Sequence, residues 1–357
     1  MLKTRLILAA FLTSAAALAQ TADTGTAHKA AATALFDPNN IGAAHLACPA
    51  YISAEVATSY PPGGGPAQVA GAGGRGAGGR GASGGGGGRG ASGGGAGRGP
   101  GATPARDSWY AEGGQVFDNL YMLTTKANTA WAIKTSDGII LIDTLFGYAA
   151  QDEIVDGMKK LGLNPADIKY IVVSHAHGDH DGAVKFLQDT YKPHVILSPK
   201  DWELAAREPN PYKHDMDAAD GEKLTLGDTT ITIYITPGHT GGTLSFLIPV
   251  KEHGVPHMAF EWGGTALGAN TSKEMLQSYI ANAGRMMDVA AGAGADILIG
   301  NHTEYNNALE RLDRTKARKP GDPNPWLVGK PEVVRYLTVV QECAKSWLAI
   351  DEGRPWN

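Results

Sequence analysis

The chain has 357 residues, 43% of them hydrophobic, and its 31 basic and 36 acidic side chains give a formal net charge of −5. This length is enough for one large domain with extensions or for two small domains. Beyond the N-terminus no apolar run approaches the roughly 20 residues that a transmembrane helix requires, which excludes a multi-spanning membrane protein.

The N-terminus has the pattern of a secretory signal peptide. Lys3 and Arg5 form a short basic region, residues 6–12 are apolar, and the small residues at 17–19 resemble a cleavage site. We therefore predict a signal peptide over residues 1–19. The protein is expected to be periplasmic or secreted, with no stable membrane insertion after cleavage. An uncleaved membrane anchor is the alternative.

Residues 20–60 are interpreted as an N-terminal extension, and a Gly-rich segment of low complexity follows over residues 61–106. Such a segment cannot bury enough apolar surface to offset its backbone entropy, which predicts a disordered spacer. Its five arginines are not balanced by any acidic residue. Arg-Gly repeats also occur in RNA-binding segments, but this one has no aromatic residue to stack on a base. We expect no nucleic-acid partner; transient contact with an anionic cell surface is the alternative.

The sequence contains two cysteines, Cys48 and Cys343. In an oxidising compartment a disulfide between them would join the N-terminal extension to the C-terminal helix. Two independent buried thiols are an equally good interpretation.

From residue 107 onward, short apolar runs alternate with helical patterns. The runs predict strands at residues 115–124, 128–135, 138–143, 167–174, 194–198, 223–226, 230–235, 243–248, 256–262 and 297–299. Pro249 has no N–H group to give to a sheet and is expected to end the strand at 243–248.

Amphipathic patterns predict helices at residues 148–161, 182–191, 272–291 and 331–350. Two successive sets of strands, each closed by helices, predict two sheets packed face to face with helices outside. We assign residues 107–315 to one catalytic domain and residues 316–357 to a C-terminal helical extension.

The most informative stretch follows the strand at 167–174. Its sequence is His175-Ala-His177-Gly-Asp179-His180, which places three imidazoles and a carboxylate within six residues. Zinc binds these groups when no thiolate is offered, and groups left unpaired at the end of a buried strand would be costly. A divalent metal, or a pair of metals, would satisfy them. We therefore predict a metal-dependent hydrolase.

Two further histidines occupy similar positions. His239 follows the strand at 230–235 in a Thr-Pro-Gly-His sequence, and His302 follows the strand at 297–299 in a Gly-Asn-His sequence. Three loops at strand ends thus bring histidines to what we expect to be one edge of the sandwich.

These motifs, in this order, resemble those of the metallo-β-lactamase superfamily over about residues 115–307. The resemblance implies an α+β fold, the four-layer αββα sandwich of the metallo-β-lactamase type, with two Zn²⁺ ions. Asp143 stands where the superfamily has an aspartate that orients the ligand histidines. The implied ligands of the first zinc are His175, His177 and His239, and those of the second are Asp179, His180 and His302. Iron or manganese would also suit such ligands.

The resemblance also implies the chemistry. A hydroxide that bridges the two metals is expected to attack the substrate, with Asp179 orienting it and moving its proton. Six His and Asp ligands, with neither a bridging aspartate nor a cysteine, are most similar to the third, secreted subclass of metallo-β-lactamases. We therefore predict hydrolysis of β-lactams. Hydrolysis of another ester, lactone, thioester or sulfate, with no real β-lactamase role, is the alternative.

Contacts to a small-molecule substrate are harder to predict. Thr265 stands where these β-lactamases often have serines that bind the substrate, although a turn residue is the alternative. Trp109 and Tyr110, with Phe146, are expected at the site mouth if they are not ordinary core residues. Glu261 stands near the position of the bridging aspartate of lactonase-like members, and the sequence leaves its contact with the metals open. It also leaves the oligomeric state open.

Overall fold

The computed structural model describes residues 25–35, 103–268 and 271–352. The predicted signal peptide, Cys48 and the Gly-rich segment up to residue 102 lie outside the described residues. Within the described ranges, no helix has both the length and the apolar character needed to cross a bilayer.

The first sheet has seven strands, which follow one another across the sheet in chain order. β1 to β4 are antiparallel to their neighbours, whereas β4 to β7 run parallel to one another. The strands are β1 (Gly114–Phe117), β2 (Leu120–Thr124), β3 (Thr129–Thr135), β4 (Gly138–Ile142), β5 (Ile168–Val172), β6 (His194–Leu197) and β7 (Met216–Asp217).

The second sheet has five strands in the order β12-β11-β10-β9-β8. Its pairs are antiparallel except for β11 and β12, which are parallel. The strands are β8 (Glu222–Leu226), β9 (Thr229–Ile235), β10 (Leu244–Glu252), β11 (Val255–Glu261) and β12 (Ile297–Ile299).

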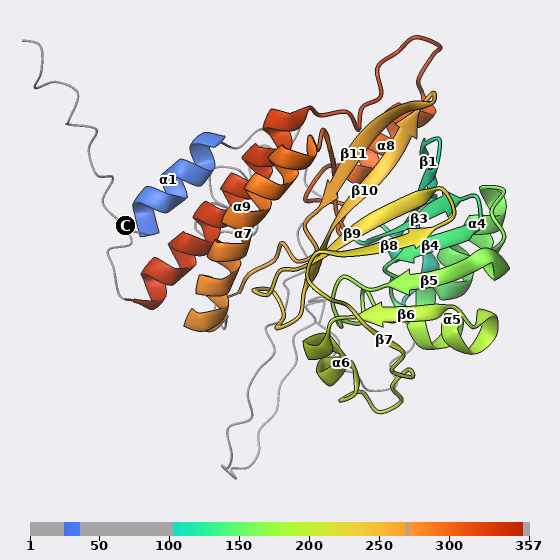
Figure 1. Ribbon diagram of the computed structural model, residues 1–357, viewed down its shortest axis with the longest axis horizontal. Helices are drawn as coiled ribbons and strands as arrows, with labels where there is room; N and C mark the ends of the chain where they lie inside the picture. The colour runs from blue at the N-terminus through green and yellow to red at the C-terminus, as the bar shows by residue number, and fades with distance from the viewer. Residues whose placement is uncertain (1–24, 36–102, 269–270, 353–357) are drawn as a thin grey trace, which may run out of the picture.

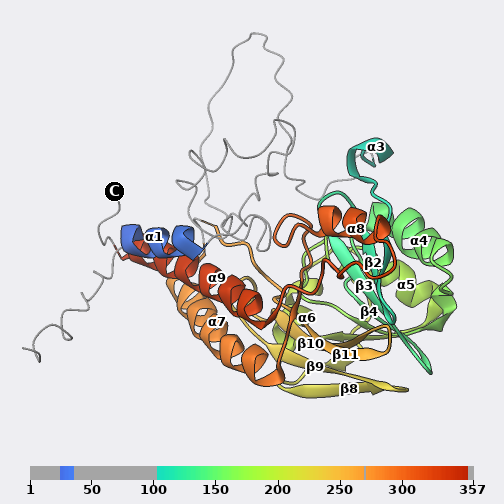
Figure 2. The same ribbon diagram turned by 90° about the horizontal axis from the view of Figure 1, so that it is seen from above.

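The two sheets pack face to face, and helices cover both outer faces (Figures 1 and 2). Long helices α7 (Lys273–Ala293) and α9 (Lys330–Asp351) lie on the second sheet, and α1 (Gly25–Leu35) packs on α9. The shorter helices α4 (Asp156–Lys160) and α5 (Val184–Tyr191) lie on the first. The predicted four-layer αββα sandwich is therefore confirmed. Among the described residues, the remaining α-helices are α3 (Arg106–Trp109), α6 (Pro199–Ala205) and α8 (Ala308–Lys316).

Three apolar layers hold these four layers of structure together, and β3 shows how the sequence builds them. Ala130 and Ala132 face the outer helices, while Trp131 and Ile133 face the other sheet. Because side chains alternate across a strand, one strand contributes to two layers, and both of its faces are apolar.

The structure corrects several details of the predicted elements. The run at 115–124 is two strands, β1 and β2, joined by a turn at Asp118 and Asn119. β10 continues through Pro249 to Glu252. It pairs with β9 only up to Leu247, so on that side Pro249 has no ladder bond to lose. α1, α6, α8 and β7 were not predicted.

Cys343 is fully buried in α9 and is part of a disulfide. This excludes the interpretation of Cys343 as a free buried thiol. Cys48, the other cysteine of the sequence, is not among the described residues.

The helix predicted over 148–161 begins with a 3-10 turn, η4 (Gly147–Ala149), followed by the π-helix η5 (Ala150–Val155) and then α4. Glu153 in η5 is 2% exposed, and its carboxylate accepts a hydrogen bond from the Ala111 N–H at 3.3 Å. Burial, partly offset by this N–H and by Arg106, raises the pKa of Glu153 to about 8.

We expect Glu153→Gln to change how stability depends on pH. The folded chain holds a proton on Glu153 up to about pH 8, whereas the unfolded chain loses it near its ordinary pKa of about 4.3. The wild-type free energy of unfolding therefore falls as pH rises through this window, by roughly 5 kcal/mol in total and by roughly 3.5 kcal/mol between pH 5 and pH 8. The Glu153→Gln variant should not lose stability in this way. Denaturant unfolding of the EDTA-treated wild type and variant at pH 5 and pH 8 measures the change in free energy of unfolding. The same change in both proteins would contradict the prediction.

Candidate metal centre

The ends of five strands meet at one edge of the sandwich. Asp143 follows β4, and the segment from His175 to His180 follows β5. His239 follows β9, Glu261 ends β11, and His302 follows β12. The structure thus brings together residues that are far apart in the sequence, because strands of both sheets end at this edge.

The first group of candidate ligands consists of His175, His177 and His239. The Nε2 atom of His239 lies 3.1 Å from Nε2 of His175 and 3.2 Å from Nδ1 of His177. His175 is buried, and the other two are partly exposed. The three nitrogens face a common point.

Backbone carbonyls determine which nitrogen of two of these rings carries the proton. His175 Nδ1 is 2.9 Å from the Gly263 carbonyl oxygen, and His239 Nδ1 is 2.7 Å from that of Ala266. Because a carbonyl oxygen only accepts, each Nδ1 must donate its proton. Each Nε2 then has a lone pair directed at the common point, as a metal ligand requires.

The second group consists of Asp179, His180 and His302. The Nε2 atoms of His180 and His302 are 3.1 Å apart, and Oδ2 of Asp179 lies 3.3 and 3.5 Å from them, respectively. The side chain of Asp179 is 23% exposed and that of His302 19%, so solvent reaches this group.

Asp143 supports both the second group and the loop that carries it. Its Oδ2 accepts hydrogen bonds from His180 Nδ1 at 3.0 Å and from the Ser174 hydroxyl at 2.8 Å, and its Oδ1 accepts from the Ser174 N–H at 2.6 Å. Asp143 has a positive φ of 60°, a conformation that aspartate tolerates better than most residues. This geometry lets Asp143 orient His180.

The donors and their spacing fit zinc. Tetrahedral zinc with bonds of about 2.0–2.1 Å holds its ligand nitrogens about 3.3 Å apart. The nitrogen–nitrogen distances in the two groups are 3.1 to 3.2 Å. The two groups are also adjacent, since the ring centroids of His175 and His180 are 4.2 Å apart. Two neighbouring cations can therefore be held.

Electrostatics differ between the groups. Burial lowers the pKa of His175 well below its usual range, and burial together with His177 lowers that of His239 to about 3. Both rings are therefore neutral near pH 7. Burial opposes charge on His180, but Asp179 and Asp143 outweigh it and raise its pKa. Burial likewise opposes ionisation of Asp179, and His180 and His302 outweigh it, so its pKa falls.

Two positioning residues of this edge were missed from the sequence. Asn128, in the turn between β2 and β3, donates from Nδ2 to Oδ2 of Asp179 at 3.0 Å. Asp201 in α6 accepts at 2.9 Å from both the Ala176 N–H and the Thr240 hydroxyl, and so ties the His175 loop to the His239 loop. The sequence placed Asn128 at the start of the strand predicted over 128–135 and Asp201 outside every predicted element, so neither pattern indicated these contacts.

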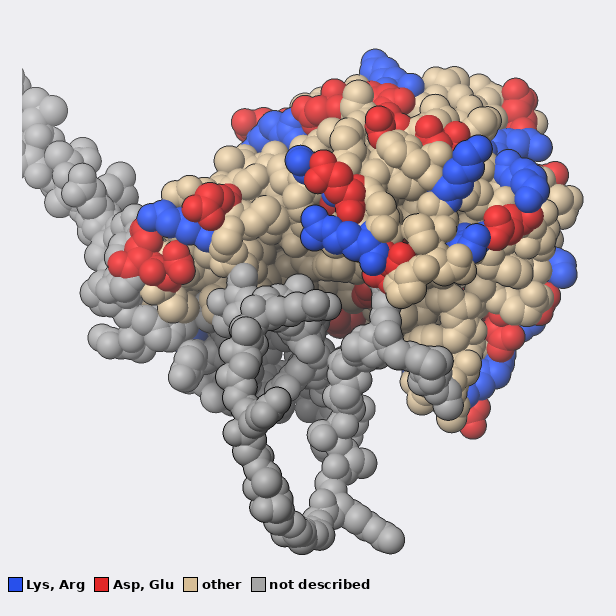
Figure 3. Space-filling model, turned by 90° about the horizontal axis from the view of Figure 1, so that it is seen from below, with Lys and Arg blue, Asp and Glu red and all other residues tan. Residues whose placement is uncertain are grey.

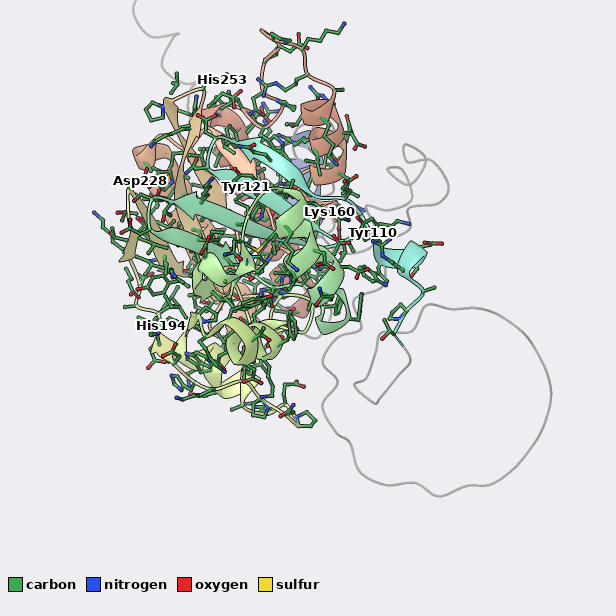
Figure 4. The ribbon with its side chains drawn as sticks, turned by 90° about the vertical axis from the view of Figure 1, so that its right-hand side faces the viewer. Tyr110, Tyr121, Lys160, His194, Asp228 and His253 are labelled. Atoms are coloured by element: carbon green, nitrogen blue, oxygen red, sulfur yellow. The ribbon has the colours of Figure 1, made fainter. Side chains whose placement is uncertain are left out.

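The predicted substrate contacts occupy different environments. Thr265 is 2% exposed, and its hydroxyl shares a hydrogen bond with that of Tyr336, an arrangement typical of a structural residue. Its contact with substrate stays a prediction. Tyr110 lies beside Lys160, whose ammonium donates to its hydroxyl at 3.1 Å (Figure 4). Trp109 is 8% exposed and packs against Tyr148, with ring centroids 5.2 Å apart.

Tyr148, which the sequence did not single out, extends this aromatic group. Its ring stacks on Phe146 with centroids 5.0 Å apart. Burial and the charge of Asp179 both raise the pKa of Tyr148.

Glu261 belongs to neither group of candidate ligands. Its side chain is fully buried, and neither carboxyl oxygen has a hydrogen-bond partner among the described residues. Burial and the charge of Asp143 raise its pKa well above the usual range. Burial of Glu261 therefore disfavours a negative charge on its side chain.

On the face in Figure 3, basic and acidic side chains of the described residues are intermingled.

Comparisons with known proteins agree with this geometry. Residues 123–253 match the family model of the metallo-beta-lactamase superfamily. The structure of BJP-1, a subclass B3 metallo-beta-lactamase of Bradyrhizobium japonicum, is similar with a TM-score of 0.58 and 29% identity, over 65% of this chain and 91% of that one. The metallo-beta-lactamase GOB-18 from Elizabethkingia meningoseptica is similar in fold, with a TM-score of 0.57 and 24% identity over 71% of this chain and 97% of its own.

Sequence relatives are more diverse. The lactamase-like protein adaB of Aspergillus niger is 30% identical over 214 residues, which cover 54% of this chain and 61% of the relative. The N-acyl homoserine lactonase AttM of Agrobacterium fabrum is 36% identical over 112 residues, which cover 26% of this chain and 41% of the relative. The chain thus spans about two fifths to three fifths of the length of these relatives.

Proposed function

We propose that this chain, of which residues 123–253 match the family model of the metallo-beta-lactamase superfamily, is a secreted dizinc hydrolase that opens the amide bond of β-lactams. The observation that carries the proposal is the pair of adjacent three-residue groups, both made of His and Asp alone. Glu261, the carboxylate at the end of β11, stays outside both groups. The similarity to BJP-1 over 91% of that chain supports the same substrate class.

Specific roles follow for the residues of the site. His175, His177 and His239 would hold one zinc, and Asp179, His180 and His302 the other. Bound zinc supplies Lewis acidity and lowers the pKa of water toward about 7. Asp179 is kept ionised by the nearby histidines, so its carboxylate can accept a hydrogen bond from the attacking water and orient it. The lowered pKa makes this carboxylate a weak base, so its role is to relay the water's proton to the leaving group without keeping it. Asn128 holds this carboxylate in place.

A second candidate function is hydrolysis of a lactone. It is favoured by the 36% identity to an N-acyl homoserine lactonase over 112 residues. An acyl chain could pack against the stacked aromatic residues Phe146 and Tyr148. The signal-peptide pattern of residues 1–19 supports a periplasmic or secreted location for either activity.

The test is hydrolysis of a carbapenem, a cephalosporin and an N-acyl homoserine lactone by the purified, zinc-loaded protein. We expect β-lactam ring opening that EDTA reduces at least about 10³-fold and that added zinc restores, because water without a metal is a far weaker acid. The loss of substrate absorbance measures it. Zinc-bound, folded protein that cleaves the lactone and leaves both β-lactams intact would replace the first candidate function with the second.

A further inference from the structure

The loop after β11, residues 263–266, orients two of the three histidines in the first ligand group. Its carbonyl groups at Gly263 and Ala266 accept the Nδ1 protons of His175 and His239, respectively. The position of this loop therefore determines where both Nε2 lone pairs point. A small displacement of the loop would turn both rings.

The 263–266 loop packs tightly on the metal side. A Cβ atom on Gly264 would lie 2.5 Å from Cβ of His239, and one on Gly263 would lie 1.7 Å from the Leu244 carbonyl oxygen. Both distances are far shorter than real contacts, so the loop directly abuts the histidine that it orients. The 263–266 loop therefore cannot move toward the metal site. Its position depends on the contacts that hold it on the opposite side.

The outer helices control the other side of the loop. The Thr265 carbonyl accepts a hydrogen bond from the Tyr279 hydroxyl of α7 at 2.9 Å, and the Thr265 hydroxyl shares one with the Tyr336 hydroxyl of α9. Trp262 donates from Nε1 to the Tyr279 hydroxyl at 3.0 Å. Both tyrosines are at most 2% exposed, so water cannot replace these bonds without opening the layer.

We propose that Tyr336 is a positioning residue for the first ligand group, acting through Thr265 and the 263–266 loop on His175 and His239. The proposal rests on the proposed function only in that these histidines hold zinc. It gives the C-terminal helix α9 a role that the resemblance to the β-lactamases does not explain. α9 packs along α7 on the outer face of the second sheet (Figure 2). Tyr336 connects α9 to the 263–266 loop through its hydrogen bond with Thr265.

The experiment compares zinc binding by the wild-type chain with that by Tyr336→Phe, Thr265→Val and the double variant. Competition with a chromophoric chelator gives the two zinc dissociation constants, and Co²⁺ substitution reports ligand geometry by its visible spectrum. We expect each single variant to weaken one zinc site about tenfold, the low end for residues that orient ligands. The double variant should bind zinc no more weakly than either single variant, because the two substitutions remove the same hydrogen bond. The Co²⁺ spectrum should shift in all three.

Ser346→Ala is the matched control. Ser346 is also buried in α9, but its hydroxyl donates to the Gly25 carbonyl of α1 at 2.9 Å, on the side away from the loop. Zinc affinity should stay at the wild-type value in this variant even if its Tm falls as much as that of Tyr336→Phe.

Several outcomes would overturn the proposal. Unchanged zinc affinity in Tyr336→Phe would do so, as would an equal loss in Ser346→Ala, which would indicate general loosening of α9. A raised KM in Thr265→Val with wild-type zinc affinity would identify Thr265 as a substrate contact instead. Wild-type protein that binds no zinc would overturn the proposed function as well, whereas zinc-binding wild type with an unaffected Tyr336→Phe would overturn this inference alone.

Discussion

Replacing His239 by Ala should reduce hydrolysis at least about 10³-fold and lower the metal content from two ions to one. Substitutions of residues beside a metal ligand already cost about 10- to 100-fold in metal affinity or activity, and this substitution removes one of the three ligands itself. His239 Nε2 lies 3.1 Å from Nε2 of His175 and 3.2 Å from Nδ1 of His177. Elemental analysis of the purified variant and kcat/KM for the substrate that wild type accepts measure both effects.

The fold should survive this substitution. The loop before His239 is held through the Pro237 carbonyl, which accepts from the Ser278 hydroxyl at 3.0 Å and from Asn282 Nδ2 at 3.1 Å. Both bonds remain in the variant. His194→Ala is the control, because this side chain is 62% exposed and lies at the start of β6, away from the strand ends that form the site (Figure 4). A folded His239→Ala protein with wild-type activity would show that the first group is not catalytic.

The candidate ligands were predictable because their signal is local. Each histidine loop directly follows an apolar strand, so several strong metal-binding side chains stand where a buried element ends. The order of the apolar runs and helical patterns along the chain is equally readable, and its two sets of strands closed by helices correctly predicted two packed sheets. The sequence pattern was therefore sufficient to predict both the two-sheet architecture and the candidate metal ligands at the edge of the sandwich.

The supporting contacts were not predictable, because they join residues with no signal in common. Thr265 and Tyr336 are 71 positions apart, and Asn128 and Asp179 are 51 apart. Thr265 has the pattern of a turn residue, Tyr336 that of a helix residue and Asn128 that of a strand residue, and the His-rich motif around Asp179 does not indicate which residue supports it. The predicted end of β10 before Pro249 was wrong for a related reason. The effect of Pro249 depends on whether β9 still pairs with β10 at that position. Such facts depend on which strands are neighbours, and a single strand's sequence does not contain that information.

Asp179→Asn should affect the second ligand group and leave the first intact. The amide has nearly the same shape as the carboxylate but lacks its charge, so it is a weaker ligand and a poor proton acceptor. We expect kcat to fall about 10²- to 10⁴-fold, the range for loss of a general base. One metal ion should remain bound, because His175, His177 and His239 are untouched. Steady-state kinetics and elemental analysis, with His194→Ala again as the control, measure both quantities.

The comparison with Asn128→Ala then distinguishes two roles of Asp179. Asn128 touches Asp179 Oδ2 at 3.0 Å and leaves its charge intact, so removing it should loosen the carboxylate without removing a ligand. If Asp179 acts mainly by its position, Asn128→Ala should lose a large part of the activity and keep two metal ions. If charge is what matters, Asn128→Ala should stay near wild type while Asp179→Asn fails. Full activity with two bound ions in Asp179→Asn would contradict both roles, because an uncharged side chain would then hold the second ion and move the proton equally well.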